Sequence, residues 1–516
     1  MTWRRTPLAL LFSLPVLAAD LDMITRIRAE GFHHSQVMDT AWYLTDVLGP
    51  RLTNSPQLAK ANDWTRDRFA QYGLENARLE SWGPFGVGWS LERVSVHMTA
   101  PVVQALHALP RAWSPGTDGL LRGKAAYVKL EREADLETAK GKLKDRIALI
   151  SAPPEIKDED TAPHDRYDEK ELQKLGEYEI RGPDGEPGEW RRLAGLRERL
   201  RTLLKQEGAL AALEAGRGAG VLRVGGTGGW KQDAERGVPW LTLMPEQYNR
   251  LVRLVERGMD VELEIDLRVR FHEDELMGHN TLAEIPGSDK KEELVMAGAH
   301  LDSWHPATGA TDNAAGCAVM LEAARILKTV GARPRRTIRF VLWTGEEQYL
   351  GGSKAYVARH FARRADAEDP AQDGPPVEQP KKPGALQLLP DHRKLSAYFN
   401  VDSGTGRIRG VYALENAGAA ALLRDWLEPL RDLGASLVTM NPDDGTDTEP
   451  FDEAGLPAFP FAQDRIAYRS RTWHTTLDVY DRLKREDLMQ AAVVVATVLH
   501  EAAMSDQPMP RKPQPK

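Results

Sequence analysis

Cysteine is almost absent from this sequence, because Cys317 is the only one among its 516 residues. An internal disulfide is therefore excluded, and no cysteine near residue 20 is available for attachment of a lipid. Cys317 lies within the small-residue run Ala314–Ala318, so we expect it to pack as a small hydrophobic side chain. We expect no nucleophilic role for it, since the neighbouring sequence offers no paired base.

An excess of positive charge is also missing. The chain carries 68 Lys and Arg against 76 Asp and Glu, which gives a formal net charge of -8. Nucleic acid is not an expected partner, because nothing in this balance would attract a phosphate backbone. The hydrophobic fraction of 41% is ordinary for a globular protein, and 516 residues exceed what a single core can organise. We therefore expect two or three domains.

We expect an apolar segment of the export type only at the N-terminus. The run Leu8–Ala19 follows two arginines and is interrupted only by Ser13 and Pro15. It is too short to span a bilayer, and it has the pattern of a secretory signal peptide, which we assign to residues 1–19. A short membrane anchor is the alternative. We expect export to the periplasm or the extracellular space, and no membrane span elsewhere in the chain.

Beyond residue 280 the sequence alternates between apolar strands and amphipathic helices. Strands are predicted at Leu294–Ala299, Thr337–Thr344 and Leu395–Val401, and a helix at Asn313–Thr329. This alternation predicts an α/β fold with a mostly parallel sheet and helices on both faces. Residues 106–267 differ in composition and carry no cluster of metal-ligating residues, so we expect an inserted accessory domain there.

Two polar residues, His300 and Asp302, come directly after the strand Leu294–Ala299, and Asp312 lies where the next helix begins. In an open α/β sheet, ligands collect at the carboxyl ends of the strands. Taken singly, such residues are more often a loop histidine and a helix-capping aspartate. A metal site therefore requires matching ligands from elsewhere in the chain.

Matching residues follow later segments: Glu346 and Glu347 after one strand, Asp402 after another, and His474 in a late loop. Two imidazoles with several carboxylates suit zinc better than magnesium or calcium. Three of these groups would hold one ion, whereas five with one shared carboxylate would hold two. We favour two ions bridged by Asp312, with His300 and Asp402 on one and Glu347 and His474 on the other.

The neighbouring side chains of Glu346 and Glu347 diverge, so one carboxylate can bind metal while the other stays free. We assign the free role to Glu346, as a general base that takes a proton from a bridging water and returns it to the leaving amine. Asp302 is placed to accept the second ring N–H of His300 and so to set its tautomer. A solvated surface pair is the alternative interpretation of the two glutamates.

Five segments carry a resemblance to a known family: GAHLDSW, GATDNAAG, LWTGEEQYLGGSKAY, FNVDSG and WHTTLDVYDRL. They resemble the motifs of the co-catalytic dizinc aminopeptidase and glutamate carboxypeptidase family, in particular its plasma glutamate carboxypeptidase branch and bacterial relatives. The likeness covers about 200 residues, from Asn280 to Leu483. Five motifs in the right order make it far more specific than any single one.

The resemblance implies a phosphorylase/hydrolase-like α/β fold that holds two Zn²⁺ ions. The peptidase domain would comprise residues 20–105 and 268–505, interrupted by a β-rich protease-associated domain at 106–267, with a disordered tail at 506–516. The implied metal ligands are His300, Asp312, Glu347, Asp402 and His474. Glu346 would be the general base and Asp302 would support the site.

One departure concerns the tyrosine that many relatives use to donate a hydrogen bond to the tetrahedral oxyanion. Here Trp473 precedes His474, so Trp473 Nε1–H or Tyr468 is the candidate donor. In the segment GTDTEPF, Thr448 stands where the family has a histidine, next to Asp447. Among the other histidines, only His305 lies in the loop between His300 and Asp312, which we call the metal loop. We do not expect His305 to be a metal ligand.

These features predict an exported zinc exopeptidase, an aminopeptidase or dipeptidase, in which a metal-bridging hydroxide attacks the scissile carbonyl. A carboxypeptidase acting on peptide C-termini is the alternative. A non-catalytic receptor-like homologue and a glutaminyl-cyclase-like acyltransferase are weaker ones, because every ligand position is filled. As partners we expect peptide substrates, no nucleic acid and no membrane span, and we allow for a homodimer.

Overall fold

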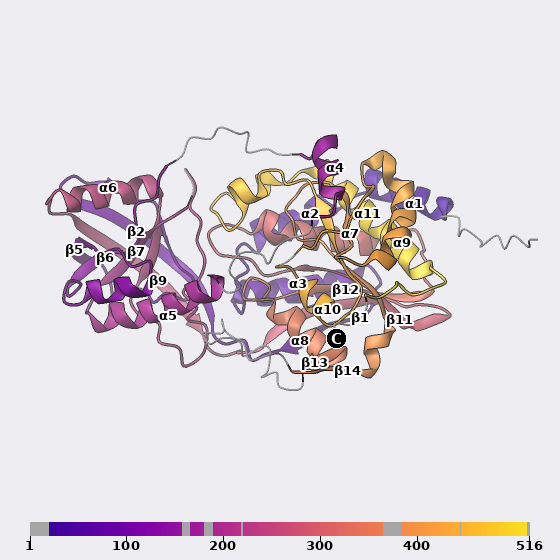
Figure 1. The fold of residues 1–516 in the computed structure, drawn as a ribbon, viewed down its shortest axis with the longest axis horizontal. Coiled ribbons are helices and arrows are strands. Elements are labelled where there is room, and N and C mark those ends of the chain that lie inside the picture. The colour runs from indigo at the N-terminus through magenta and orange to yellow at the C-terminus, as the bar shows by residue number, and fades with distance from the viewer. Residues whose placement is uncertain are drawn as a thin grey trace, which may run out of the picture.

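The computed structural model describes residues 20–156, 166–179, 189–217, 220–364, 384–443 and 445–512. The predicted signal peptide lies outside these residues. The described strands form two eight-stranded sheets and a small pair, β13 (Ala362–Arg364) with β14 (Leu386–Leu388). The two large sheets belong to two bodies that lie side by side along the long axis of the molecule (Figure 1).

The larger body is built on a mixed sheet. Its order is β1 (Glu75–Trp82), β10 (Gly278–Ile285), β12 (Arg336–Trp343), β11 (Lys290–His300), β15 (Leu395–Asn400), β18 (Ala458–Gln463), β16 (Ile408–Tyr412) and β17 (Leu437–Thr439). The four central strands, β12, β11, β15 and β18, pair in parallel. Antiparallel pairs flank them on both sides. The predicted α/β fold is therefore confirmed, with its parallel pairing concentrated in the centre.

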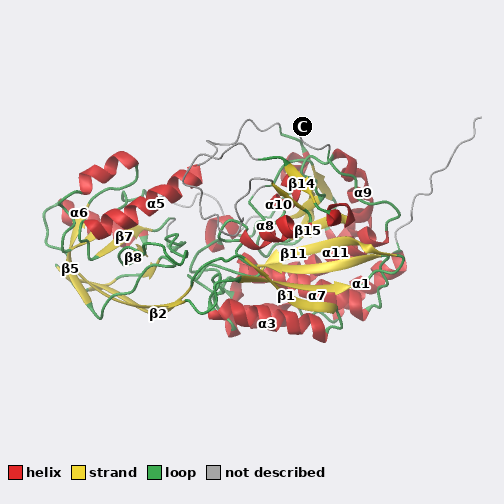
Figure 2. Cartoon of the chain, turned by 90° about the horizontal axis from the view of Figure 1, so that it is seen from below, coloured by secondary structure: helices red, strands yellow, loops and turns green. Residues whose placement is uncertain are grey.

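Helices cover both faces of this sheet, as Figure 2 shows. Alternate residues of β11 divide between the two cores, since Val295 and Ala297 face one and Leu294 and Met296 face the other. The first core is shared with α1 (Leu21–His33), α2 (Val37–Trp42), α3 (Pro56–Gln71), α7 (Ala315–Thr329), α9 (Ala417–Leu427) and α11 (Arg485–Met504). The second is shared with α8 (Gly351–His360) and α10 (Glu449–Glu453).

The smaller body, which we call the accessory region, is formed by residues 88–272. Its sheet has the order β3 (Gln104–Ala105), β2 (Gly88–Ala100), β9 (Glu262–His272), β5 (Leu121–Tyr127), β6 (Arg146–Leu149), β7 (Ala211–Ala215), β8 (Trp240–Leu243) and β4 (Ala108–Pro110). Helices α5 (Glu189–Gln206) and α6 (Pro245–Glu256) pack into separate apolar clusters, one on each face. The chain leaves the larger sheet after β1 and returns to it at β10.

Strand β2 pairs with β9 along its length, so Gly88–Ala100 lies in the second sheet, whereas the sequence predicts residues 20–105 as one part of the peptidase domain. Helix α5 ends at Gln206. Gly208 follows with φ +70, a left-handed conformation that glycine favours and that ends a helix. The boundaries of the domains as functional units remain a prediction.

The tail predicted to be disordered is ordered over residues 506–512. Met509 is buried, and its backbone N–H donates to Ser396 Oγ at 3.3 Å. Arg511 donates to the carbonyls of His392 and Leu395, each at 2.9 Å. The burial of Met509 and these three hydrogen bonds outweigh the conformational entropy that the segment loses on ordering. The proline-rich composition alone predicts disorder.

One short helix of the accessory region lies on the larger body. Helix α4 (Glu169–Gly176) is drawn above that body in Figure 1. Just before it, Arg166 forms ion pairs with Asp464 and Asp487 at 3.0 and 2.7 Å. After it, the backbone N–H of Glu179 donates to Asn441 Oδ1 at 3.0 Å. The two bodies are therefore tied together at a point remote in sequence from both chain crossings.

Among the described residues, one helix, α11, is long and apolar enough to cross a membrane by composition alone. Its most apolar window is 83% buried inside the protein, where it packs against α7 and the larger sheet. The hydropathy of α11 is that of a core helix.

Candidate metal centre

The five predicted ligands converge at the carboxyl edge of the parallel strands. His300 is the last residue of β11, and Asp402 follows the neighbouring strand β15. Glu347 follows β12 after a turn at Gly345, whose φ of +74 and contact with the Trp82 ring exclude a side chain there. Because these strands are parallel neighbours, their ends meet at one edge of the sheet.

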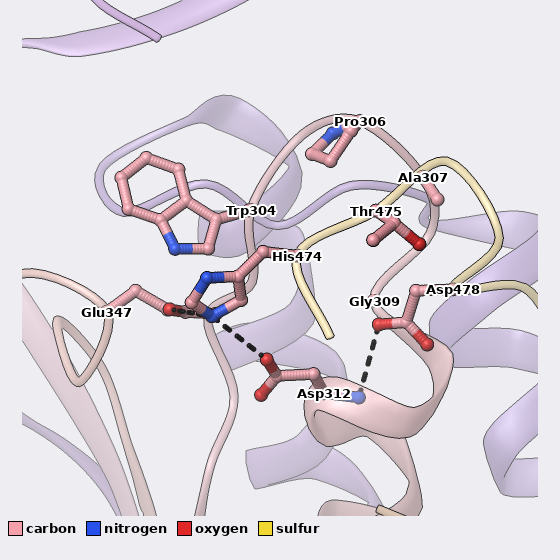
Figure 3. Close-up of a pocket in the computed structure, with 9 residues that line it drawn as sticks. All are labelled: Trp304, Pro306, Ala307, Gly309, Asp312, Glu347, His474, Thr475 and Asp478. Atoms are coloured by element: carbon pink, nitrogen blue, oxygen red, sulfur yellow. Dashed lines mark hydrogen bonds and ion pairs between the residues drawn. The ribbon is translucent and has the colours of Figure 1, made fainter. Parts of the chain in front are cut away.

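Each imidazole lies against two carboxylates. His300 Nε2 is 3.1 Å from Asp312 and 3.0 Å from Asp402, and His474 Nε2 is 3.0 Å from Glu347 and 3.2 Å from Asp312. Figure 3 shows the second of these groupings, with Asp312 and Glu347 both directed at His474. The ligand atoms of each grouping lie within 4.8 Å of one another. Asp312 is the residue that the two groupings share.

A backbone carbonyl sets the tautomer of His300. His300 Nδ1 lies 3.0 Å from the carbonyl oxygen of Asp302, which can only accept a hydrogen bond. Nδ1 must therefore carry the proton, and in the neutral ring Nε2 keeps its lone pair toward the carboxylates. The acceptor differs from the predicted one, since the Asp302 carboxylate itself is 3.8 Å from Nδ1.

The Asp302 carboxylate has a different task. It accepts the backbone N–H groups of Glu346 and Glu347, each at 3.3 Å, and the Thr53 hydroxyl at 3.0 Å. Asp302 is fully buried, so these hydrogen bonds replace its lost hydration. The turn that presents the two glutamates is thereby tied to the end of β11.

Crowding of buried carboxylates perturbs the titration of the centre. Burial raises the pKa of Glu347 to about 7, against the opposing effect of His474, and raises the pKa of Glu346 well above its usual range. Burial would lower the pKa of His300, but Asp402 and other carboxylates outweigh it and raise that pKa strongly. The pKa of His474 rises to about 9, because Glu347 and Asp312 outweigh its burial. A bound cation would relieve this negative charge.

The donor set fits a zinc ion by its chemistry and by its unsatisfied atoms. Two imidazole nitrogens with carboxylate oxygens are typical zinc ligands. Glu347 Oε1 is buried and has no hydrogen-bond partner among the described residues, which is costly unless a cation lies beside it. The Glu346 carboxylate joins a further grouping with His300 and Glu347.

Two buried supports of the centre were not singled out from the sequence. Asp478 accepts the Thr311 hydroxyl and backbone N–H at 2.7 and 2.6 Å, and the Asp312 N–H at 3.2 Å. Arg51 is fully buried and donates to the carbonyls of Leu301, Thr308 and Gly309, which shapes the loop between β11 and Asp312. Asp478 lies in a recognised motif, but Arg51 lies about 250 residues from the carbonyls it binds.

Another support holds Asp402. Asn313 Nδ2 donates to Asp402 Oδ1 at 3.1 Å and to the Val401 carbonyl at 2.9 Å. The residue beside Asp312 in sequence thus orients the carboxylate that shares His300 with Asp312. The peptide bond between Asp312 and Asn313 is cis.

The two candidate oxyanion donors, Tyr468 and Trp473, have different surroundings. Tyr468 is buried with its ring against Gly404, and its pKa is raised well above the usual value by burial and by nearby Asp312 and Asp402. The Trp473 ring packs on the His474 ring at a centroid distance of 4.2 Å. The guanidinium groups of Arg223 and Arg469 each lie 4.7 Å from the Trp473 ring. Trp473 is therefore held as a packing partner of the histidine.

A large cleft of about 1420 Å³ connects the centre with the accessory region. Its lining includes Asp312, Glu346, Glu347, Asp402 and His474 on one side and residues of α5 and of the segment 223–235 on the other. A smaller pocket against the metal loop, lined by Trp304, Pro306 and Asp478 among others, reaches the same ligands (Figure 3).

The remaining histidine of the metal loop faces away from the ligands. His305 Nε2 donates to the Pro110 carbonyl at 2.7 Å, and its ring meets Trp89 edge to face. Burial lowers its pKa to about 4. Asp447 is also buried, and burial raises its pKa to about 8. Neither residue joins a metal-type grouping among the described residues.

Comparison with known proteins agrees with this geometry. Residues 280–499 match the model of peptidase family M28. The chain is 26% identical to carboxypeptidase Q of Mus musculus over 495 residues, which is 95% of this chain and 90% of that protein. It resembles the crystal structure of a peptidase M28 precursor from Shewanella amazonensis, at 22% identity and a TM-score of 0.67 over 96% of this chain and 99% of the other.

A second solved structure is a zinc aminopeptidase from Bacillus subtilis, at 18% identity and a TM-score of 0.56, with 91% of this chain and 95% of the other covered. At these identities the two structures support the fold alone. The matches to the family model and to carboxypeptidase Q also support the class of activity, which is peptide hydrolysis. This chain is therefore a metallopeptidase, a hydrolase related to carboxypeptidase Q, and its residues 280–499 match peptidase family M28.

Proposed function

We propose that the protein is an exopeptidase that works with two zinc ions. The observation that carries the proposal is the sharing of Asp312 between two imidazole–carboxylate groupings. His300 and Asp402 would hold one ion, Glu347 and His474 the other, and Asp312 would bridge them. The description of the Bacillus subtilis relative as a zinc aminopeptidase supports the choice of metal.

When bound, zinc polarises the scissile carbonyl and acidifies the attacking water. Glu346 lies beside the ligands, and among the described residues its carboxylate forms no hydrogen bond or ion pair. We assign it the role of taking the proton from the water and delivering it to the leaving amine. Tyr468 and Trp473 both line the cleft that contains the ligands, and either the Tyr468 hydroxyl or Trp473 Nε1–H would donate to the oxyanion.

Replacement of Glu346 by Gln tests the base. We expect peptide hydrolysis to fall by about 10²–10⁴-fold with zinc content unchanged, because only the proton transfer is removed. Glu198→Gln is the control, since Glu198 lines the same cleft from α5 and is exposed. Substantial residual activity in the Glu346 variant, with Glu198→Gln normal, would exclude Glu346 as the base.

The second part of the proposal concerns which terminus of the peptide the enzyme recognises. An aminopeptidase or dipeptidase would recognise a free α-amine, and a carboxypeptidase would recognise a free α-carboxylate. N-blocked dipeptides distinguish the two directly, because only the carboxypeptidase would cleave them. A non-catalytic homologue is disfavoured because all five ligand positions are filled and converge.

We also propose that residues 1–19 direct export, on the basis of their signal-peptide pattern. Cell fractionation with N-terminal sequencing tests this, and a cytoplasmic product that keeps residues 1–19 would contradict it. A homodimer remains a prediction to be tested by light scattering.

A further inference from the structure

Residues 464–474, which we call the ligand loop, follow β18 and end at a predicted metal ligand. Asp464 at the start of this loop is fully buried, and its carboxylate accepts the backbone N–H of Tyr167 at 3.1 Å. It also forms ion pairs with Arg166 at 3.0 Å and with Arg409 at 3.1 Å. Two of these three partners belong to the accessory region. Among the residues that the structure describes, the larger body supplies only Arg409.

The same arginine of the accessory region reaches a second buried carboxylate. Arg166 Nη2 lies 2.7 Å from Asp487, which is in the first turn of α11 and only 2% exposed. Arg407 also lies near Asp487, with its Nε at 3.5 Å. One planar guanidinium thus joins carboxylates from two elements of the larger body, each through a different nitrogen. Its removal would leave buried negative charge with too few partners, which is costly.

Tyr167 extends this contact to the next residue of the ligand loop. Arg465 Nε donates to the Tyr167 hydroxyl at 3.0 Å, and its guanidinium lies 5.3 Å from the centroid of the Tyr167 ring. The Tyr167 carbonyl accepts from Arg409 at 3.2 Å. The backbone N–H, the carbonyl and the side chain of Tyr167 therefore all contact the larger body, at or beside the first two residues of the ligand loop.

The start of the ligand loop is linked to the metal centre through Gln463, the residue before it. The Gln463 side chain accepts the Ser403 backbone N–H at 3.1 Å and donates to the Gly404 carbonyl at 3.2 Å. Ser403 directly follows the predicted ligand Asp402, and the ring of Tyr468 lies against Gly404. A displacement at the start of the ligand loop would therefore reach both the turn after Asp402 and the candidate oxyanion donor.

The accessory region also holds the other end of the ligand loop. Arg223 donates to the Arg469 carbonyl at 3.1 Å, and the backbone N–H of Val224 donates to the His474 carbonyl at 3.1 Å. Arg166 and Arg223 come from different segments of the accessory region, on either side of α5. The loop that carries His474 is thus fixed at its start and at its end by a body to which it does not belong.

We propose that Arg166 and Tyr167 are positioning residues of the metal centre. By fixing the start of the ligand loop, they would set the positions of Tyr468 and His474 without contacting the metal or the substrate. The accessory region would then complete the metal centre as well as form a wall of the cleft. The inference rests on the proposed two-zinc function, because it takes His474 and Asp402 as the ligands that the contact supports.

The test compares Arg166→Ala with Arg199→Ala as the matched control. Arg166 is 37% exposed, and Arg199 is 44% exposed and pairs with Glu133 inside the accessory region. We expect Arg166→Ala to weaken zinc binding by about tenfold, measured by competition with a chelator. The visible absorption of the cobalt-substituted protein should shift, because it reports the geometry of the ligands. The kcat for Ala-Leu should fall by about tenfold with KM changed less than about twofold, since no substrate contact is removed.

Arg166→Lys tests whether the geometry of the guanidinium matters. A lysine keeps the positive charge but pairs with one carboxylate at a time, so we expect values between those of the wild type and Arg166→Ala. Tyr167→Phe removes only the hydrogen bond from Arg465 to the hydroxyl and should cause a smaller loss of zinc affinity. Should Arg166→Ala fail to fold, these two milder variants decide by the same measurements, and wild-type values in both would contradict the proposal.

Two further outcomes overturn the positioning role. One is an unchanged zinc affinity and cobalt spectrum in a folded Arg166→Ala protein. The other is an equal loss in Arg199→Ala, which would mean that any weakening of the accessory region has the same effect. If the wild type binds zinc but hydrolyses no peptide, the proposed function fails separately. The zinc and cobalt measurements then still decide whether Arg166 and Tyr167 position the metal centre.

Discussion

The backbone N–H of Val224 donates to the carbonyl of His474 at 3.1 Å, so the accessory region holds the loop that carries a predicted metal ligand. The contact continues on the next residues, because Thr476 N–H donates to the Leu222 carbonyl at 3.0 Å. His474 itself has φ +58, a left-handed conformation that costs a non-glycine residue about 1 kcal/mol or more. Hydrogen bonds from outside the larger body thus stabilise the strained conformation of His474.

Arg223 lies at the centre of this contact. Its guanidinium stacks on Trp473 and donates to the Arg469 carbonyl at 3.1 Å. We expect Arg223→Ala to weaken zinc binding by about tenfold and to lower kcat. The reason is that the loop carrying His474 loses the contacts of Arg223 with Trp473 and with the Arg469 carbonyl. Zinc titration and steady-state kinetics measure both effects. Arg122→Ala, an exposed position on the second sheet, is the control, and equal behaviour of the two variants would contradict the role.

Removal of the Asp302 carboxylate should disturb the turn that carries Glu346 and Glu347, and not only the position of His300. Asp302→Ala leaves the backbone N–H groups of Glu346 and Glu347 without their acceptor, and the Thr53 hydroxyl keeps only Gln348 Oε1. We expect a loss of about 10–100-fold in metal affinity or activity, with Asp302→Asn intermediate because it keeps one oxygen. Wild-type activity in Asp302→Ala would show that the turn at Glu346 and Glu347 keeps its conformation without the Asp302 carboxylate.

Asp478→Asn should disturb Asp312. The carboxylate accepts from Thr311 and from the Asp312 N–H, whereas an amide group would place a donor against at least one of these donors. We expect zinc affinity to fall by about 10–100-fold and stability by about 1–3 kcal/mol. Asp481→Asn, three residues later and exposed, should behave as wild type in chelator competition and thermal unfolding.

The metal-free protein should lose stability as the pH rises. Glu347 has its pKa raised to about 7 and His474 to about 9, so the folded chain binds protons more tightly than the unfolded chain at both. The Glu347 contribution to stability falls between about pH 4.5 and 7, and the His474 contribution between about pH 6.5 and 9. Thermal unfolding after chelation, measured from pH 5 to 9, checks the sign.

Zinc should reverse this trend, because it binds the deprotonated ligands and so stabilises the folded chain more as the pH rises. The gap in Tm between zinc-loaded and chelated protein should therefore widen from pH 5 to pH 8. A gap that stays constant over this range would mean that the titrating groups are not the ligands.

Much of this arrangement follows from the sequence. The apolar runs before His300, Glu346 and Asp402 predict strands, and parallel strands bring their carboxyl ends to one edge whatever the details of packing. Local signals of this kind rest on periodicity and on residue type, which the chain carries without its fold. They predicted the α/β class, the zinc chemistry and the five residues that converge.

The tertiary structure decided what depends on contacts between distant segments. It placed β2 in the second sheet, because strand pairing is set by partners far along the chain. It showed that a backbone carbonyl, that of Asp302, fixes the tautomer of His300. It also showed that Arg51 and Val224 stabilise loops of the site through hydrogen-bond partners about 250 residues away. Such features arise from packing geometry, and neither spacing nor composition in a sequence records which buried groups end up face to face.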